Sequence, residues 1–327
     1  MTVVVLMSER LAARLLTPAA LGSLPPPGAT LVDADPADLA ATLRGARAVI
    51  TGWDTPPLTD DVLDACPDLG LVAHSGGSIR ALVPASVFDR GIRVTQVAAV
   101  LAEGVAEFTV MQILAGLRDA YGFVASMRAG EPWAELAARP PGRLLRDQVV
   151  GVVGASRVGR ATLARLRPFG CRLLVHDPYL DAAGARELGA ELTDLAGLLR
   201  SCDVVSLHAP LLPATRGMLG VDQLALLRDG ALLVNTARAG LVDDDALIAE
   251  VRSGRITALL DVFAEEPLPV ESPWRGLPGA VPTPHLAALT RETLHEQGDA
   301  AVAEVRRFLA GEPLCHEVTR DAYGVIA

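Results

Sequence analysis

Aromatic residues are scarce in this chain, because Phe, Trp and Tyr together make up 4% of its 327 residues. Apolar residues nevertheless account for 50% of the sequence, so we expect aliphatic side chains and Ala-rich helices to fill its cores. A chain of this length is enough for about two domains of roughly 100–200 residues each.

Cysteine is also rare. Cys66, Cys171, Cys202 and Cys315 are scattered along the chain, and none belongs to a Cys-x-x-Cys pair. Such spacing is typical of small buried apolar side chains rather than of disulfides or metal ligands. The sequence therefore predicts no metal site and does not indicate an oxidising compartment.

The chain lacks clustered positive charge. Its formal net charge is −10, and charges of both signs are interspersed, whereas a nucleic-acid surface needs clustered Lys and Arg. No apolar run approaches the ~20 residues that a membrane helix needs. The first apolar run, at residues 3–6, has no basic segment before it and is predicted as a strand rather than a signal peptide. We expect a cytoplasmic protein that binds neither nucleic acid nor membranes.

Short β-type runs alternate with helical runs throughout residues 1–98. Strands are predicted at 3–6, 30–32, 48–51, 69–74 and 92–94, and helices at 35–43 and 60–65. Such alternation predicts a parallel sheet with helices on both faces. We expect this sheet to be complete before residue 99.

A long apolar helix is predicted at residues 100–118. Because it is apolar on most sides, we expect it to be buried nearly all round, between domains, in a subunit interface, or both. A homodimer is therefore expected. Residues 130–142, which contain three prolines, are predicted to be an irregular connection.

The alternation resumes after residue 179. Strands are predicted at 204–207, 231–235 and 256–261, helices at 222–227, 243–252 and 290–309, and a Pro-rich loop at 266–284. Asp243 is the expected N-cap of one helix and Gly254 its stop, and Gly311 ends the last helix. We expect two α/β domains: residues 1–98 completed by 290–327, and residues 99–289.

The order strand, glycine turn, helix, strand between residues 145 and 179 is that of a nucleotide-binding βαβ unit. Gly154 is predicted to make the tight turn, and Gly159 to let the helix approach the strand. The N-terminus of that helix would then offer free N–H groups to a pyrophosphate. Ser156 stands where the usual fingerprint has its middle glycine, and its hydroxyl is able to donate to a phosphate oxygen.

Asp177 ends the next apolar run, 18 residues after Gly159. A carboxylate at this spacing accepts hydrogen bonds from the adenosine ribose and repels a 2′-phosphate. Pro178 and Tyr179 follow it, so no arginine stands there to hold that phosphate. The glycine pattern alone is also typical of an ordinary βα turn, but together with Asp177 it predicts NAD rather than NADP.

Polar residues lie in three later stretches. Arg238 follows one apolar run, Asp261 and Glu266 follow the next, and His285 lies in the 281–290 segment. Ligands of open α/β sheets lie beyond the carboxyl ends of the strands, where these residues are expected. Each also has a purely structural interpretation, as a surface arginine, a solvated loop carboxylate or a loop histidine. Their joint occurrence on a dinucleotide scaffold favours a catalytic role.

Over essentially its whole length the chain resembles the NAD-dependent D-isomer-specific 2-hydroxyacid dehydrogenases. The motifs that carry the resemblance are VGVVGASRVGR (150–160), HDPY (176–179), CDVVSLHAPLLPATRGML (202–219), LLVNTARAGLVDDDAL (232–247), ALLDVFAEEPLP (258–269) and TPHLAALT (283–290). The resemblance implies two doubly wound parallel-sheet domains, a flavodoxin-like substrate domain and a Rossmann NAD-binding domain.

The resemblance also implies roles for individual residues. Arg238 would bind the substrate carboxylate through its planar fork. His285 would be the general acid and base, a role that suits imidazole because it ordinarily titrates near neutral pH. Glu266 would pair with His285 and orient it, and Asp261 would hold the nicotinamide carboxamide. The other implied cofactor-binding residues are Gly154, Ser156, Arg157, Val158, Gly159, Asp177, His208, Pro210, Thr215, Thr236 and Ala237.

In the family, backbone N–H groups of a first-domain loop bind the substrate carboxylate, and here that loop contains Ser75, Gly76 and Gly77. The commoner pattern is Gly-x-Gly-x-Asp, whereas this chain has adjacent glycines and no aspartate. His74 and Arg80 are therefore further candidates for substrate contact.

The sequence thus predicts an oxidoreductase that transfers a hydride between NAD(H) and a small D-2-hydroxy or 2-keto acid. Phosphoglycerate oxidation and the reduction of glyoxylate or hydroxypyruvate remain open as reactions. The alternative is an NAD(H)-sensing regulatory or binding protein on the same fold, with little turnover.

Overall fold

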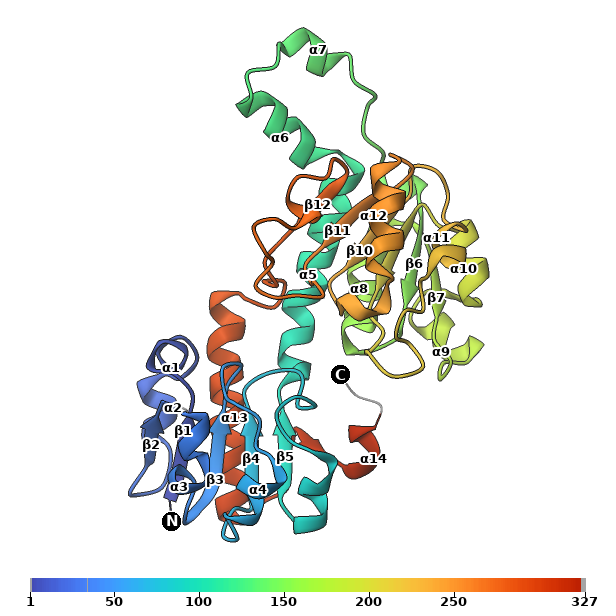
Figure 1. Cartoon of the computed structure of the whole chain (residues 1–327). Coiled ribbons are helices and arrows are strands. Elements are labelled where there is room, and N and C mark those ends of the chain that lie inside the picture. Colours follow the sequence, from blue (N-terminus) through green and yellow to red (C-terminus); the bar gives the residue numbers. More distant parts are fainter. Residues whose placement is uncertain (1, 34, 325–327) are drawn as a thin grey trace. The chain divides into compact units, whose positions relative to one another are not determined.

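The computed structural model describes residues 2–33 and 35–324 (Figure 1). The chain divides into two compact units. Unit 1 comprises Met1–Leu101 and Leu289–Ala327, and unit 2 comprises Ala102–Ala288. The sequence placed the divisions after residues 98 and 289. The first division falls inside helix α5 (Ala98–Leu117).

Unit 1 contains a six-stranded sheet in the order β13-β5-β4-β3-β1-β2. Its strands are β1 (Thr2–Leu6), β2 (Ala29–Val32), β3 (Ala46–Thr51), β4 (Leu71–His74), β5 (Arg93–Gln96) and β13 (Glu317–Val318). The first five are parallel in flavodoxin-like order, as expected. The prediction that this sheet ends before residue 99 is wrong, because β13 pairs antiparallel with β5. Two residues are too few to show a strand periodicity.

The helices of unit 1 lie between its strands and at the C-terminus. They are α1 (Glu9–Leu15), α2 (Pro18–Gly22), α3 (Leu39–Thr42), α4 (Asp60–Asp64), α13 (Arg291–Ala310) and α14 (Arg320–Tyr323), with 3-10 turns η1 (Pro36–Asp38) and η2 (Ala85–Arg90). Helix α13 packs on α1, β3 and β4. It ends at Gly311, whose φ of 72° is the left-handed conformation expected of a helix stop.

Unit 2 contains a seven-stranded parallel sheet in the order β12-β11-β10-β9-β6-β7-β8. Its strands are β6 (Val149–Val153), β7 (Arg172–His176), β8 (Glu191–Leu192), β9 (Val204–Leu207), β10 (Leu232–Asn235), β11 (Thr257–Leu260) and β12 (Ala280–Pro282). Numbered from β6, this is the Rossmann order 3-2-1-4-5-6 with β12 added at one edge. The predicted pair of doubly wound α/β sheets is confirmed.

The helices of unit 2 cover both faces of its sheet and add an extension. Besides α5 they are α6 (Ala120–Arg128), α7 (Trp133–Ala137), α8 (Arg157–Leu166), α9 (Ala182–Glu187), α10 (Leu195–Ser201), α11 (Val221–Leu224) and α12 (Asp244–Arg252), with 3-10 turns η3 (Leu145–Asp147), η4 (Arg167–Phe169), η5 (Ala239–Leu241) and η6 (Pro273–Arg275). Asp243 caps α12 as predicted, since its carboxylate accepts from Ala246 N at 3.0 Å. Helices α6 and α7 stand away from the sheet of unit 2 (Figure 1).

Three predicted segments differ from the structure. The 130–142 connection contains α7, and the Pro-rich loop at 266–284 contains η6 and β12. The helix predicted at 35–43 is divided into η1 and α3, and residue 34 lies outside the described residues. Residues 280–282 form strand β12 because they pair with β11, although the last of them is a proline.

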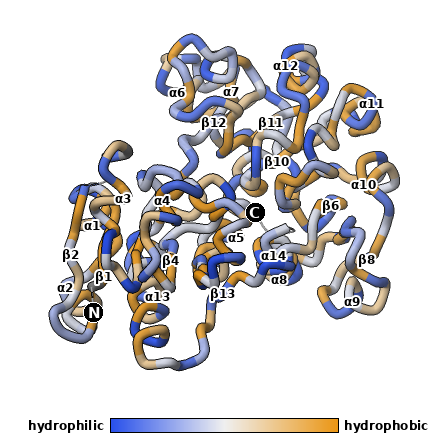
Figure 2. Tube along the Cα trace, turned by 60° about the horizontal axis from the view of Figure 1, so that its bottom comes forward, coloured by the Kyte–Doolittle hydropathy of each residue, from blue (hydrophilic) through white to orange (hydrophobic). Residues whose placement is uncertain are grey.

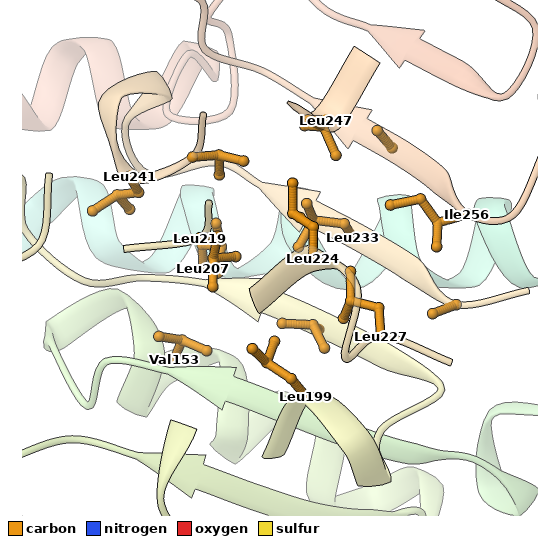
Figure 3. Packing of buried hydrophobic residues seen from close by; sticks show 14 of the residues in the cluster. Val153, Leu199, Leu207, Leu219, Leu224, Leu227, Leu233, Leu241, Leu247 and Ile256 are labelled. Carbon is orange, nitrogen blue, oxygen red and sulfur yellow. The ribbon is translucent and has the colours of Figure 1, made fainter. Parts of the chain in front are cut away.

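Each sheet is covered by apolar side chains on both faces. Along β9 and β10 successive residues alternate between the two clusters of unit 2, with Val204 and Leu232 in one and Val205 and Leu233 in the other. Figure 3 shows the second cluster, in which Leu199, Leu224 and Leu247 join the strand residues. The cores are aliphatic, as the shortage of aromatic residues predicts.

Helix α5 differs from its prediction in two respects. It is 20 residues long with a mean hydropathy of 1.5, so by length and composition alone it could span a membrane, and 44% of it is buried. The prediction that no apolar run approaches the length of a membrane helix is therefore wrong. Core helices of soluble proteins show the same length and composition. Within the single chain α5 is not buried all round, because Met111 is 44% exposed and Glu103 and Glu107 reach solvent. Burial of this face in a subunit interface stays a prediction.

Candidate functional site

The glycine turn after β6 requires glycine at two positions. Gly154 has a φ of 99°, and a Cβ there would lie 2.6 Å from the backbone nitrogen of Ala209. A Cβ on Gly159 would lie 2.0 Å from the carbonyl oxygen of Gly154. Both predicted reasons for glycine, the tight turn and the close approach of helix to strand, are confirmed.

Ser156 is the N-cap of α8, a function that the sequence reasoning missed. Its Oγ accepts a hydrogen bond from Gly159 N at 3.2 Å. Arg157 is exposed at the first helical position, and Val158 beside it is half-buried. In the part of the chain that the structure describes, the N–H groups of these two residues have no acceptor, which is the arrangement that binds anions at helix starts.

The Asp177 carboxylate lies beside this turn. One oxygen accepts from Ala155 N at 2.7 Å, and the other accepts from Tyr179 N at 2.8 Å. These bonds fix the carboxylate at the carboxyl end of β7, next to the start of α8. This is where the fingerprint places the acceptor for ribose hydroxyls.

His208 lies under the same turn. Its Cβ is 3.3 Å from the position that a Cβ of Gly159 would take. Its Nε2 is 2.8 Å from Ser206 Oγ, and its buried Nδ1 has no partner among the described residues. Burial lowers the pKa of His208 to about 3, so the ring is neutral. The turn leaves no room for a Cβ at Gly154 or Gly159, and the unpaired Nδ1 of His208 lies beside it. This arrangement fits a bound dinucleotide.

The remaining predicted cofactor residues hold loops at the carboxyl ends of β9 and β10. Thr215 Oγ1 donates to the carbonyl of Pro210 at 2.6 Å and so closes the loop after β9. Thr236 Oγ1 lies 2.8 Å from Thr109 Oγ1 on α5. Ala237 N donates to the side chain of Asn235 at 3.0 Å. These polar side chains thus shape the edge of the sheet next to the glycine turn.

Arg238 follows β10 in a turn that is closed by hydrogen bonds to the side chain of Asn235. Asn235 Nδ2 donates to the carbonyl of Arg238 at 2.9 Å, and Arg238 Nη1 donates to the carbonyl of Ala237 at 2.7 Å. Burial lowers the pKa of Arg238, and the nearby charge of Glu266 raises it. A guanidinium nevertheless stays charged in proteins, so this side chain is a partly buried cation able to bind an anion.

Glu266 and His285 form a direct pair. His285 Nδ1 lies 2.6 Å from Glu266 Oε2, and Glu266 Oε1 accepts from Phe263 N at 2.9 Å. The bond at Nδ1 leaves Nε2 on the opposite side of a ring that is 52% exposed. The φ of His285 is 49°, in the left-handed region that non-glycine residues rarely adopt. Backbone strain of this kind gathers at functional sites, and here it falls on the predicted acid–base residue.

Asp261 binds the loop that carries His285. Its carboxylate is 1% exposed and accepts from Thr283 Oγ1 at 2.6 Å, Leu286 N at 3.1 Å and Ala287 N at 2.8 Å. The sequence reasoning assigned Asp261 only to the cofactor and did not list Asn235 as a site residue. Both directly end an apolar strand, and that position is the signal for such a role.

In unit 1 the predicted carboxylate loop offers fewer donors than expected. Ser75 donates both its N–H, at 2.9 Å, and its hydroxyl, at 2.7 Å, to the carbonyl of Thr51. Within the described residues, the N–H groups of Gly76 and Gly77 have no acceptor. His74 is buried with its Nδ1 3.0 Å from Thr51 Oγ1, and burial lowers its pKa to about 4. The loop therefore presents neutral groups.

Arg80 holds the C-terminal segment. Its Nη2 donates to the carbonyls of Tyr323 at 3.1 Å and Gly324 at 2.7 Å, and the guanidinium lies 5.9 Å from the centre of the Tyr323 ring. The Tyr323 hydroxyl donates in turn to the carbonyl of Val83 at 2.8 Å. These contacts give Arg80 a structural role, and its contact with a substrate stays a prediction.

Unit 2 brings together Arg238, Glu266 and His285 beside the glycine turn. The family model of the D-isomer specific 2-hydroxyacid dehydrogenase NAD-binding domain matches residues 110–287, which lie within unit 2. The chain belongs to this family, and unit 2 contains its NAD-binding domain.

Individual relatives differ in the length that they share with this chain. A D-3-phosphoglycerate dehydrogenase of Mycobacterium leprae is 37% identical over 267 residues, which are 81% of this chain and 50% of that protein. The chain thus spans about half the length of the phosphoglycerate dehydrogenases that it matches first. A glyoxylate reductase of Aeropyrum pernix is 34% identical over 306 residues, 92% of this chain and 89% of that protein. The crystal structure of the TT0316 protein from Thermus thermophilus has 31% identity and a TM-score of 0.84, covering 98% of this chain and 100% of that chain.

Proposed function

We propose that this protein is an NAD-dependent oxidoreductase that interconverts small 2-keto acids and D-2-hydroxy acids. The observation that carries this proposal is the 2.6 Å contact between His285 Nδ1 and Glu266 Oε2, with the charged Arg238 in the same domain and near Glu266. Relatives named glyoxylate reductase and phosphoglycerate dehydrogenase support the same class of substrate.

Each of these residues has a separate role in the proposed reaction. Arg238 binds the substrate carboxylate, and its fork provides two parallel hydrogen bonds. Bound NADH supplies the hydride that is added to C2 of the keto acid. His285 donates a proton from Nε2 to the keto oxygen, and in the reverse direction it accepts that proton. Glu266 holds the ring in place through its contact with Nδ1.

The loop after β4 in unit 1 contains the other residues that we propose for binding a carboxylate. The free N–H groups of Gly76 and Gly77 are the donors of this loop, whereas both donors of Ser75 are occupied. Two neutral donors hold a carboxylate without adding charge. The specific substrate then depends on the side chains around this loop.

The direct test supplies NADH with a panel of 2-keto acids and follows the nicotinamide absorbance. We expect turnover by the native protein and its loss in Arg238→Gln and His285→Asn. The exposed residues Arg252 and His295 provide matched controls, because Arg252→Gln and His295→Asn remove the same groups outside the site. Tight NADH binding without reduction of any 2-keto acid would instead favour the sensing role.

We further infer a homodimer that forms through α5, α6 and α7. Large apolar side chains are exposed along this stretch, namely Met111 (44%), Tyr121 (36%), Val124 (48%), Met127 (50%), Trp133 (77%) and Leu144 (49%). Hydrophobic and hydrophilic residues alternate along α6 and α7 (Figure 2). Patches of this kind mark protein interfaces. Analytical ultracentrifugation of the native protein and of Met127→Glu tests this, and a native monomer refutes it.

A cytoplasmic location without nucleic-acid or membrane partners is likewise our inference. The four cysteines are free thiols in the structure, which suits a reducing compartment. Cell fractionation with an antibody against the native protein checks this, and recovery with membranes contradicts it.

A further inference from the structure

Thr109 and Thr236 form a pair of buried hydroxyls in unit 2. Thr109 lies on α5 and is 0% exposed, and Thr236 directly follows β10 and is 8% exposed. Their Oγ1 atoms are 2.8 Å apart. Thr236 is one of the predicted cofactor residues, whereas Thr109 has no role in the proposed function, so the contact between them needs its own explanation.

The hydrogen of the Thr109 hydroxyl is already used. Thr109 Oγ1 donates to the carbonyl of Val105, one turn earlier on α5, at 2.8 Å. Threonine commonly forms this bond inside helices. A hydroxyl has one hydrogen and two acceptor lone pairs. In the contact between the two threonines Thr109 is therefore the acceptor, and Thr236 is the donor.

Thr236 consequently has no hydrogen left for a ligand. Among the residues that the structure describes, its Oγ1 forms no hydrogen bond other than the one to Thr109. The remaining lone pairs of Thr236 Oγ1 can only accept a hydrogen bond. The direction of the buried bond thus decides which kind of ligand group Thr236 is able to bind.

Thr236 lies in one row with the glycine turn. The last residues of β10, β9 and β6 are level with one another in the sheet. The residues that directly follow them are Thr236, His208 and Gly154. Since neighbouring strands are about 4.8 Å apart, Thr236 is two strand spacings, about 10 Å, from Gly154. The row runs along the carboxyl edge, where this fold binds its ligand.

A dinucleotide on a Rossmann sheet crosses the point at which the strand order reverses. In unit 2 this point lies between β6 and β9. Asp177, at the end of β7, is the predicted partner of the adenosine ribose, so the nicotinamide half is expected at the ends of β9 and β10. That half has hydrogen-bond donors on its ribose hydroxyls and on its carboxamide, and Thr236 is an acceptor at this place.

We propose that Thr109 is a positioning residue of the cofactor site. It accepts the hydrogen of the Thr236 hydroxyl and thereby keeps Thr236 Oγ1 as an acceptor for a donor group on the nicotinamide half of NAD(H). Because Thr109 is fully buried, it acts through Thr236. This inference rests on the cofactor binding in the proposed function and uses no property of the acid substrate.

The first test measures the affinity of Thr109→Val for NADH by fluorescence titration. Valine has nearly the shape of threonine but no acceptor, so the hydrogen of Thr236 becomes free to face the donor group of the ligand. We expect the Kd for NADH to rise about tenfold, the usual effect of one lost hydrogen bond. Thr109→Ser retains the hydroxyl and should restore the Kd to within about threefold of the native value.

Thr162→Val is the matched control. Thr162 on α8 is also 0% exposed, but its Oγ1 has no partner among the described residues. The same substitution therefore removes a buried hydroxyl without breaking a hydrogen bond. It should leave the Kd for NADH unchanged within about twofold.

A double-mutant cycle tests whether Thr109 acts through Thr236. Thr236→Val alone should raise the Kd for NADH about tenfold, and Thr109→Val added to it should change the Kd no further. A pair that only fastens the turn after β10 to α5 would behave differently. Thr109→Val would then lower the midpoint of urea unfolding and leave the Kd for NADH at the native value, which overturns the inference.

The reduced acetylpyridine analogue of NADH identifies the donor group, because a methyl ketone replaces the carboxamide and its N–H donors. A loss of affinity in Thr109→Val for NADH alone assigns the carboxamide, and an equal loss for both molecules assigns a ribose hydroxyl. Either result supports the inference. These titrations contain no acid, so a native protein that binds NADH but reduces no 2-keto acid refutes only the proposed function. A native protein that does not bind NADH refutes both.

Discussion

Nδ1 of His285 and Oε2 of Glu266 lie 2.6 Å apart, and the backbone of His285 is held at a φ of 49°. The contact fixes which ring nitrogen faces the carboxylate and leaves Nε2 free of it. The strained backbone is retained because Asp261 binds the residues on both sides of it. The proposed acid–base residue is thus positioned by two separate carboxylates.

Removing either member of this pair should lower turnover more than binding. We expect His285→Asn to lower kcat about 10²–10⁴-fold, the usual contribution of general acid–base catalysis. Glu266→Gln should lower kcat less, because the histidine remains but loses its orienting charge. Steady-state kinetics and NADH titration check this. Full turnover in both variants contradicts the assignment of the site.

Arg238→Lys should not rescue the loss of Arg238. A lysine keeps the charge but cannot form the two parallel bonds to a carboxylate, so we expect kcat/KM for the 2-keto acid to fall about tenfold or more. The affinity for NADH should stay within threefold. Arg252→Lys is the control, and equal kinetics in both lysine variants would exclude carboxylate binding by Arg238.

Asp261→Asn should destabilise the His285 loop. The amide retains one acceptor oxygen and introduces a buried donor without a partner, which costs about 1–3 kcal/mol. We expect a lower midpoint in urea together with a reduced kcat. Asp222→Asn, at an exposed position on α11, should change neither quantity. A normal kcat in a destabilised Asp261→Asn protein would show that the carboxylate supports the fold alone.

Gly154→Ala should abolish NADH binding, because its Cβ would collide with the backbone at Ala209. Gly170 is a suitable control, since its φ of 73° is also left-handed but no heavy atom lies within 4 Å of the added Cβ. Gly170→Ala should therefore cost only the conformational strain, about 1–2 kcal/mol. Fluorescence titration with NADH and urea unfolding separate the two effects. Similar results for both variants would show that strain, rather than collision, is what matters.

Stability should fall as the pH is lowered from 7.5 to 5.0. Burial lowers the pKa of His74 to about 4 and that of His208 to about 3, whereas both titrate near 6.5 when unfolded. The unfolded chain therefore binds more protons below pH 6.5, and the stabilisation present above this pH is lost toward the folded-state pKa values. Each ring should account for about 2 kcal/mol of loss at pH 5.0.

The variant His74→Gln tests this assignment. It should reduce the dependence of unfolding on pH by about half, measured by urea unfolding at both pH values. The exposed residue His295 is the control, and His295→Gln should leave the dependence unchanged. An unchanged dependence in His74→Gln would show that His74 is already free to protonate in the folded protein.

Local signals in the sequence were sufficient for most of the fold. The alternation of apolar runs predicted both parallel sheets, and residues such as Asp243 and Gly311 marked helix ends through their own side chain or lack of one. The glycine turn was equally predictable, because its geometry depends on a few neighbouring residues. Strands β12 and β13 could not be predicted in this way. They are three and two residues long, too short to show an alternating pattern, and the strands that they pair with lie elsewhere in the chain.

What the sequence determined by itself is therefore the family and the glycine turn, and it predicted Arg238, Glu266 and His285 as site residues. Only the tertiary structure decided which polar groups already form hydrogen bonds within the protein. Ser156 caps a helix, and Ser75 donates its hydroxyl to a backbone carbonyl. Arg80 Nη2 also donates to a backbone carbonyl, and Asp261 binds the His285 loop. The reason is that a hydrogen-bond donor or acceptor is defined by the residue type, whereas its partner is defined by chain segments that meet only after folding.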